Sequence, residues 1–344
     1  MAPMAQLMMA RIAGRHIVRV MSLAAIPILI GPIFGPVVAG AILQYASWHW
    51  LFLINLPIGI LAITLALFLL PSDHDQRVEH KKLDLIGLLL LSPGLVLFLY
   101  GLDHLKEQFG IATLLLSILM FAAFFCKARK DGDRALIDLR LFRSRIFSAA
   151  ALTQFIANGL SFAGQMLIAV YLIRAAGQSP SAAGWFLMPL GLGTLCAFLS
   201  LGRLTKRFGI RGTASGGASL ALLGTLLFLY LSEHPLNLTL LTGALFLQGM
   251  GMSAVGLPSI SAAYASVKKE ELPMATTSLN IVQRLGGPTL TTLCATVLDW
   301  RLAVAQHANS GVTGAFTISF TLLICLNALL IAATLTLPRS IENQ

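Results

Sequence analysis

Residues 29–40 read LIGPIFGPVVAG and place two Gly-Pro pairs four residues apart inside an apolar run. A proline inside a helix removes a backbone donor and clashes with the preceding turn, which costs about 3 kcal/mol in a water-soluble helix. Within a membrane, neighbouring groups can satisfy the freed carbonyls, and small residues let a second helix approach closely. The stretch therefore indicates a bent membrane helix whose surface carries few side-chain atoms.

The composition agrees with a membrane protein. Of the 344 residues 57% are hydrophobic and only 11% are charged, against about 25% charged in soluble domains. The mean hydropathy is +0.82. Ten apolar segments approach the ~20 residues that a spanning helix needs. They predict an all-α polytopic membrane protein with spans at about 20–43, 50–70, 84–102, 108–126, 146–173, 183–201, 212–232, 236–262, 274–298 and 313–337.

The basic residues predict the orientation of these spans. If the N-terminal stretch is cytoplasmic, only Lys106, Arg174 and Arg301 of the 24 Lys and Arg fall on the opposite side, and Arg284 falls inside a span. Such asymmetry is typical of the positive-inside rule. We therefore expect both termini to be cytoplasmic, and we assign the net charge of +10 to membrane orientation and not to nucleic-acid binding.

Clusters of residues that would indicate catalysis or metal binding are not evident in the sequence. The four cysteines lie in or beside apolar segments without metal or redox spacing, and the seven histidines are scattered. The sequence predicts no enzyme, no metal and no cofactor. A channel, or a non-transporting membrane scaffold or partner subunit, remains an alternative to a transporter.

Four stretches carry a resemblance to a known family. GPIFGPVVAGAILQYASWHWLFLINLPIGI (31–60) resembles the antiporter motif and following helix of the fourteen-span drug:proton antiporters (EmrB/QacA type) of the major facilitator superfamily. LGRLTKRFGIRG (201–212) resembles the superfamily's basic cytoplasmic loop, and residues 177–193 and 272–288 resemble later stretches in the same order. The matching positions are Gly31, Pro32, Gly35, Pro36 and Gly40 in the antiporter motif, and Gly202, Arg207 and Gly209 in the loop.

Two positions depart from the family pattern. Ala39 stands where the family usually has glycine, and Lys206 stands where it commonly has Asp. The small surface around Gly31 to Gly40 is still expected to form a close helix contact that holds the two halves together.

The resemblance implies the major facilitator fold with about ten of its membrane helices and an N-terminally truncated chain that is inactive alone. Residues 127–145 are expected to be a basic cytoplasmic linker, whose LIDLRLF segment is either an amphipathic piece on the membrane surface or a solvated connection. The implied division is 1–19 as the remnant of a fourth span and a cytoplasmic loop, 20–70 as the last two spans of the N-terminal half, 71–126 as a loop and two extra central spans, 127–145 as the linker, 146–338 as the complete six-helix C-terminal half, and 339–344 as a cytoplasmic tail.

The resemblance also implies a function. It implies multidrug efflux by proton antiport across the bacterial cytoplasmic (inner) membrane, with small amphipathic or cationic substrates. Its implied partners are protons, the lipid bilayer and a periplasmic adaptor in a tripartite pump. No acidic residue lies in the middle of a span, although a proton-coupled carrier needs a carboxylate that can change its charge there.

Polar residues inside the spans are the candidates for a substrate cavity. Arg284 is the only charged residue well inside a span. It is expected either to face a cavity or gate, or to bond backbone carbonyls, because burying it unpaired is costly. The others share helix faces, and hydrogen bonding between helices competes with substrate contact as their role; they are Gln154, Asn158, Gln165, Asn280 and Gln283.

Overall fold

The protein was analysed as a computed structural model. It describes Gly35 and residues 38–69, 84–104, 107–132, 135–268, 271–307 and 312–339. Gly31, Pro32 and Pro36 of the expected antiporter motif, and residues 1–19, lie outside the described residues.

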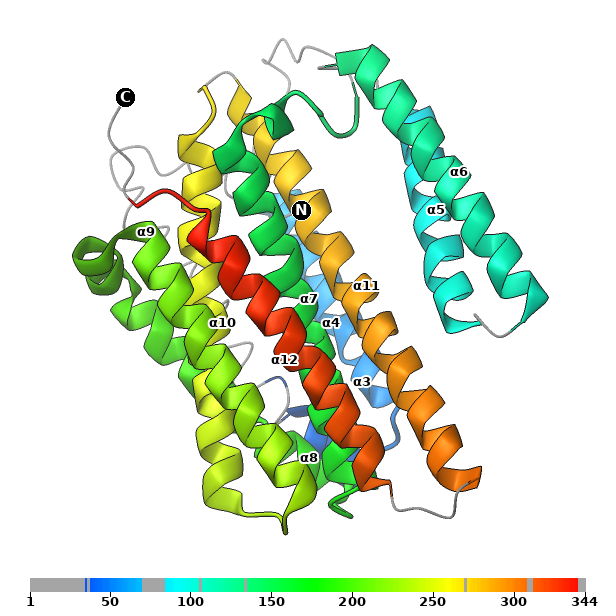
Figure 1. Ribbon diagram of the computed structural model, residues 1–344, viewed down its shortest axis with the longest axis vertical. Coiled ribbons are helices and arrows are strands. Elements are labelled where there is room, and N and C mark those ends of the chain that lie inside the picture. Colours follow the sequence, from blue (N-terminus) through cyan, green and yellow to red (C-terminus); the bar gives the residue numbers. More distant parts are fainter. Residues whose placement is uncertain are drawn as a thin grey trace.

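The described chain is built from helices, with no strand among these residues (Figure 1). The described helices cover nine of the ten predicted spans. Of the first predicted span, residues 38–45 at its end are helical. The helices are α3 (Trp50–Leu53), α4 (Asn55–Leu69), α5 (Leu85–Asp103), α6 (Gln108–Asp131), the 3-10 helix η3 (Leu141–Arg143), α7 (Arg145–Arg174), α8 (Pro180–Phe186), α9 (Met188–Glu233), α10 (Leu238–Ala265), α11 (Leu272–His307) and α12 (Thr313–Leu335).

Helix α9 consists of two limbs that turn back on each other at Gly209 (Figure 1). Gly209 has φ 72° and ψ −179°, a conformation that L side chains rarely adopt. The C-terminal segment closes this turn, because Ile210 N–H donates to the Arg339 carbonyl at 3.1 Å and Arg211 Nε donates to the Leu337 carbonyl at 2.6 Å. The turn lies within the stretch 201–212 that resembles the family's cytoplasmic loop.

We expect Gly209→Ala to destabilise the protein. The backbone region of Gly209 is essentially restricted to glycine and costs another residue about 1–3 kcal/mol, and the new Cβ would lie 2.2 Å from the Arg339 carbonyl oxygen. Thermal unfolding in detergent micelles should show a midpoint lower by several degrees. Gly202→Ala is the matched control, since nothing lies within 4 Å of its Cβ position. Equal midpoints for the two variants would contradict the assigned role of this turn.

Helices α7 to α12 form one tightly packed bundle. An added Cβ at Gly249 of α10 would lie 2.0 Å from the Leu190 carbonyl oxygen of α9, and one at Gly286 of α11 would lie 2.0 Å from the Phe155 carbonyl oxygen of α7. Such small residues allow the backbones to approach, which is the main packing device where lipid supplies no hydrophobic drive. The rings of Phe228 of α9 and of Phe316 and Phe320 of α12 are buried in the core of this bundle.

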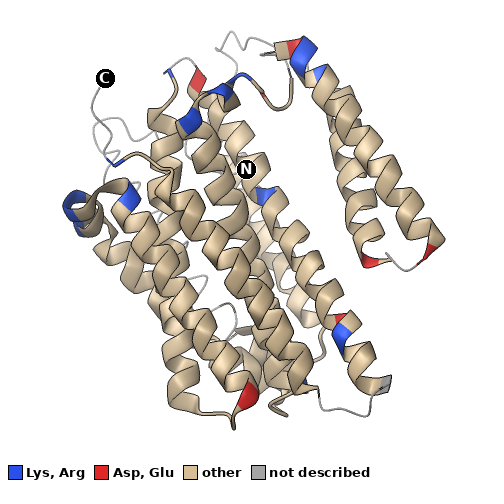
Figure 2. Cartoon of the chain, in the orientation of Figure 1, with Lys and Arg blue, Asp and Glu red and all other residues tan. Residues whose placement is uncertain are grey.

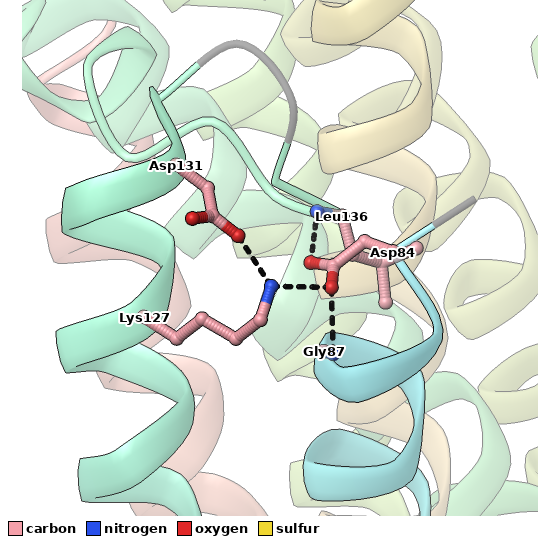
Figure 3. Close-up of polar contacts among 5 residues, drawn as sticks. All are labelled: Asp84, Gly87, Lys127, Asp131 and Leu136. Atoms are coloured by element: carbon pink, nitrogen blue, oxygen red, sulfur yellow. Dashed lines mark hydrogen bonds and ion pairs between the residues drawn. The ribbon is translucent and has the colours of Figure 1, made fainter. Parts of the chain in front are cut away.

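The hairpin of α5 and α6 lies beside this bundle (Figure 1) and is joined to the connection before α7 by a polar cluster (Figure 3). The Asp84 carboxylate accepts bonds from Gly87 N–H at 2.7 Å, Leu136 N–H at 3.1 Å and Lys127 Nζ at 2.5 Å. Lys127 also pairs with Asp131. One carboxylate therefore caps α5, binds α6 and holds the connection.

The connection before α7 differs from both sequence-based interpretations. Helix α6 continues to Asp131, so the connection begins at Gly132. Ala135 and Ile137 are buried in a cluster with Leu91 and Phe124, and Ile281 of α11 packs against it. The LIDLRLF segment therefore packs between the hairpin and α11, an arrangement that neither interpretation included, while Leu136, Leu139 and Phe142 stay partly exposed.

Helices α3 and α4 are apolar and largely exposed among the described residues. Trp50, Phe52, Leu56, Ile60 and Phe68 each expose more than half of their surface. Surfaces of this kind suit contact with lipid or with further helices.

The charged residues lie at the two ends of the helices, while the middles are almost free of charge (Figure 2). Lysine and arginine gather at the end where α7 begins at Arg145, which we call the basic end. Arg174 lies at the other end of α7. Seven helices are long and apolar enough to cross a membrane among the described residues. One of them, Pro180–Glu233, contains both limbs of α9, and the protein is a multi-pass membrane protein.

Helix α11 continues past its predicted end at 298 to His307. Its Thr296 hydroxyl donates to the Leu102 carbonyl at 3.5 Å, so Thr296 is level with the end of α5. Asp299 and Arg301 therefore lie beyond the level at which α5 ends, consistent with a position near the membrane surface.

Candidate functional site

One polar stripe runs along α7. Gln154, Asn158, Ser161 and Gln165 are spaced by four, three and four residues, which places them on a single helix face. Helices α10 and α11 both pack against α7, and members of the stripe contact each of them. Three of these four residues were predicted as cavity residues from the sequence.

Gln154 joins two helices and does not line the polar pocket described below. Its side chain is 2% exposed, and Nε2 donates to the Gly256 carbonyl at 2.6 Å and to Ser259 Oγ at 2.8 Å. Both partners belong to α10. Of the two roles considered for Gln154, hydrogen bonding between helices is therefore the one that its geometry supports.

Gln165 lies in a polar pocket between α7, α9 and α10. The pocket holds about 200 Å³, and its polar lining is completed by Ser161, Thr194, Gln248 and Ser253. Thr194 Oγ1 donates to the Leu190 carbonyl at 3.0 Å. Hydroxyls and amides on three helices therefore converge on one small space of the bundle.

Gln248 is the most informative residue of this pocket. Its side chain is 6% exposed, yet Oε1 accepts no hydrogen bond from any described residue. Its Nε2 lies against Gly164, where an added Cβ would be 2.6 Å away. An unsatisfied buried amide costs about 1–3 kcal/mol. Oε1 is therefore a buried acceptor, on a residue that lines the pocket, whose partner is not among the described residues.

The predicted polar residues of α11 do not line this pocket. An added Cβ at Gly287 would lie 3.1 Å from Asn158 Oδ1. Asn280 donates to the Thr276 carbonyl of its own helix at 2.8 Å, and Gln283 is half-buried.

Arg284 is exposed on α11 and outside the pocket. It makes no hydrogen bond or ion pair with a described residue, so the expected tie to backbone carbonyls is not formed there. Because Arg284 is exposed, a role in a cavity or gate stays the prediction for this residue.

Sequence reasoning missed four pocket residues, namely Ser161, Thr194, Gln248 and Ser253. A signal was available at Gln248, an amide in a long apolar helix, and in Gly249 and Ser253, which are four residues apart on one helix face. The sequence alone does not tell which face of an apolar helix meets lipid and which meets the bundle.

The expected family motifs are placed only in part. An added Cβ at Gly40 would lie 2.8 Å from the Ser181 carbonyl oxygen of α8, whereas Gly35 has nothing within 4 Å. Ser181 Oγ also donates to Gln44 Oε1 at 3.4 Å. Gly40 is thus in close contact with the α7–α12 bundle. Arg207 is exposed beside the Phe208 ring, 5.4 Å from its centre.

Known proteins resemble this chain along most of its length. The sequence profile of the Major Facilitator Superfamily matches residues 1–287 and 146–339. "Multidrug resistance protein B homolog" of Mycobacterium tuberculosis (strain ATCC 25618 / H37Rv) is 30% identical over 309 residues, which cover 88% of this chain and 57% of that protein.

Two further relatives cover less of the chain. A Haemophilus influenzae protein with "transport protein HsrA" in its name is 30% identical over 83% of this chain and 62% of its own length. A Citrobacter koseri protein with "multidrug resistance protein MdtD" in its name is 32% identical over 61% of this chain and 45% of its own length. The chain thus spans about half to three fifths of these relatives. On the superfamily profile and the helical bundle together, the chain belongs to the Major Facilitator Superfamily.

Proposed function

We propose that this chain is part of a bacterial inner-membrane transporter that exports small amphipathic or cationic molecules in exchange for protons. The observation that carries the proposal is the polar pocket around Gln165 and Gln248 inside an apolar helical bundle. Substrate sites of this kind combine an apolar wall with a few convergent polar groups. The multidrug-resistance names of the relatives support the substrate class.

The proposal assigns roles to the residues described above. Gln165 and Gln248 bind the substrate, and Arg284 faces the aqueous path between the two halves of the transporter. Residues 146–338 act as the C-terminal half, the close contact at Gly40 joins it to the N-terminal half, and both termini are cytoplasmic. A periplasmic adaptor belongs to the same proposal, through the family resemblance.

Efflux in a host that lacks its own drug pumps tests the proposal. One arm expresses residues 1–344 alone. The other expresses a chimera in which residues 146–339 replace the matching segment of the Mycobacterium tuberculosis relative. Alternating access rocks one half against the other around a central site. We therefore expect proton-gradient-dependent resistance from the chimera and none above the empty vector from residues 1–344 alone.

Variants of the chimera test the site itself. Gln165→Ala and Gln248→Ala should each change the apparent KM for exported dyes by about 2- to 10-fold, the effect of one lost hydrogen bond. Thr321→Val is the matched control, because this exposed hydroxyl bonds only the Thr317 carbonyl of its own helix among the described contacts. Equal transport by all three variants would contradict the assigned site. Non-saturating conductance would indicate a channel in place of a carrier.

A further inference from the structure

A groove with three arginines opens at the basic end of the protein. It holds about 600 Å³ between α6, the connection before α7, and α11. Arg129, Arg140 and Arg143 line it together with the apolar side chains of Phe125, Phe142 and Val282. The groove lies on the other side of α11 from the polar pocket, and no residue lines both.

The arginines are only partly neutralised by neighbouring acids. Arg140 binds Asp138, with Nε to Oδ1 at 3.1 Å and Nη2 to Oδ2 at 3.0 Å. The Arg129 guanidinium lies 4.5 Å from the centre of the Phe125 ring. Neither Arg129 nor Arg143 pairs with a carboxylate in the described part of the chain. The groove therefore keeps a positive charge that suits an anion.

The wall of the groove is pre-organised. The Asp138 backbone N–H donates to Ser278 Oγ of α11 at 3.3 Å, and the carboxylate of Asp138 is nearly buried. The Arg140 guanidinium carbon lies 3.5 Å from the Cβ position of Gly132, the residue that ends α6. The same connection is held from its other side by Asp84 through Leu136 N–H. The connection that forms this wall is therefore fixed before a ligand binds, whereas Arg129 and Arg143 are exposed and would be ordered by the ligand.

The chemistry of the lining selects an amphipathic anion. Arg129 and Arg143 lie at the basic end, whereas Phe125 is one turn further into the span of α6 and Val282 is ten residues into α11. A soluble anion would leave these apolar side chains uncovered. A ligand with an anionic headgroup and hydrocarbon chains would cover both parts of the groove, and basic pockets between membrane helices are suited to such headgroups.

We infer that the groove binds an anionic glycerophospholipid, with its phosphate between Arg129 and Arg143 and its acyl chains along Phe125, Phe142 and Val282. The bound lipid fills the groove left between α6, the connection before α7 and α11, and holds the hairpin against the bundle. This inference does not depend on the proposed transport activity.

Native mass spectrometry of the full chain, purified in detergent, tests the inference. The probes are dioleoyl phosphatidylglycerol and dioleoyl phosphatidylcholine, which share the same acyl chains. We expect preferential retention of phosphatidylglycerol. Arg129→Gln combined with Arg143→Gln should weaken its binding about 30-fold, since each basic residue near an anionic lipid contributes about fivefold. Arg203→Gln combined with Lys206→Gln removes the same charge from exposed positions of α9 and should leave binding within about twofold.

Two further measurements separate the contributions of charge and shape. Val282→Phe narrows the groove without changing its charge and should also weaken retention of phosphatidylglycerol. Soluble glycerol 3-phosphate should not displace the lipid. The inference is overturned if phosphatidylcholine is retained equally, if the two double variants behave alike, or if glycerol 3-phosphate competes as well as the lipid.

Discussion

The Gly249→Ala variant is expected to lose several degrees of thermal stability in detergent micelles. The added Cβ would lie 2.0 Å from the Leu190 carbonyl oxygen and 2.8 Å from its carbonyl carbon. Backbone atoms cannot rotate away, so the first limb of α9 and α10 must separate. Overpacking of this kind costs about 1–3 kcal/mol, which exceeds the gain of up to about 1 kcal/mol that alanine brings to a helix.

The matched control for this variant is Gly243→Ala in the same helix. Nothing lies within 4 Å of its Cβ position, so only the gain in helix propensity remains and the midpoint should stay constant or rise. Because Leu190 and Gly249 also line the polar pocket, Gly249→Ala should in addition change transport by the chimera. Equal midpoints for the two alanine variants would show that α9 and α10 are not in close contact.

The Asp84→Ala variant is expected to detach the α5–α6 hairpin from the connection before α7. The substitution removes the cap of α5, which by itself costs about 1 kcal/mol, and leaves Leu136 N–H without its acceptor, at a further cost of about 1–3 kcal/mol. Cysteine cross-linking between α5 and α11, at Leu102 and Thr296, should fall several-fold. Asp103→Ala at the other end of α5 is the control, because this exposed carboxylate contacts only His104 among the described ion pairs.

The same cluster makes a prediction about pH. Burial by itself raises the pKa of Asp84, but the bonds from Lys127, Gly87 N–H and Leu136 N–H outweigh it and hold the pKa below its ordinary value of 3.8. The bonds of Lys127 to Asp131 and Asp84 raise the pKa of Lys127 above its ordinary value of 10.5.

The stabilisation by Asp84 is therefore present above its ordinary pKa and is lost as the pH falls through its lowered pKa. The stabilisation by Lys127 is complete below its ordinary pKa and is lost as the pH rises through its raised pKa. The difference in unfolding midpoint between the unchanged protein and Asp84→Ala should consequently be constant between about pH 5 and pH 9. A change within this range would mean that Asp84 takes up a proton there and belongs with the candidates for proton coupling.

Long apolar segments and a few glycines allowed the sequence to predict the helices. Composition alone identifies a membrane protein, because a charged fraction of 11% does not suit a soluble domain of this size. The sequence also predicted the chain reversal within residues 201–212, between two apolar segments. The structure places Gly209 at this turn, in a backbone conformation that favours glycine. The periodicity of Gln154, Asn158 and Gln165 likewise follows from helix geometry without any tertiary contact.

Tertiary structure decided what those residues do. Gln154 and Gln165 lie on one face of α7. Gln154 donates its hydrogen bonds to Gly256 and Ser259 of α10, whereas Gln165 lines the pocket with Gln248. The difference arises from how α10 packs against α7, which no local pattern encodes. The connection before α7 has the composition of a solvated linker, but Asp84 binds Leu136 across 52 positions of the chain. Local sequence determines helices because their hydrogen bonds join residues four apart, whereas sites and docked loops depend on pairings between distant helices that form only when the bundle packs.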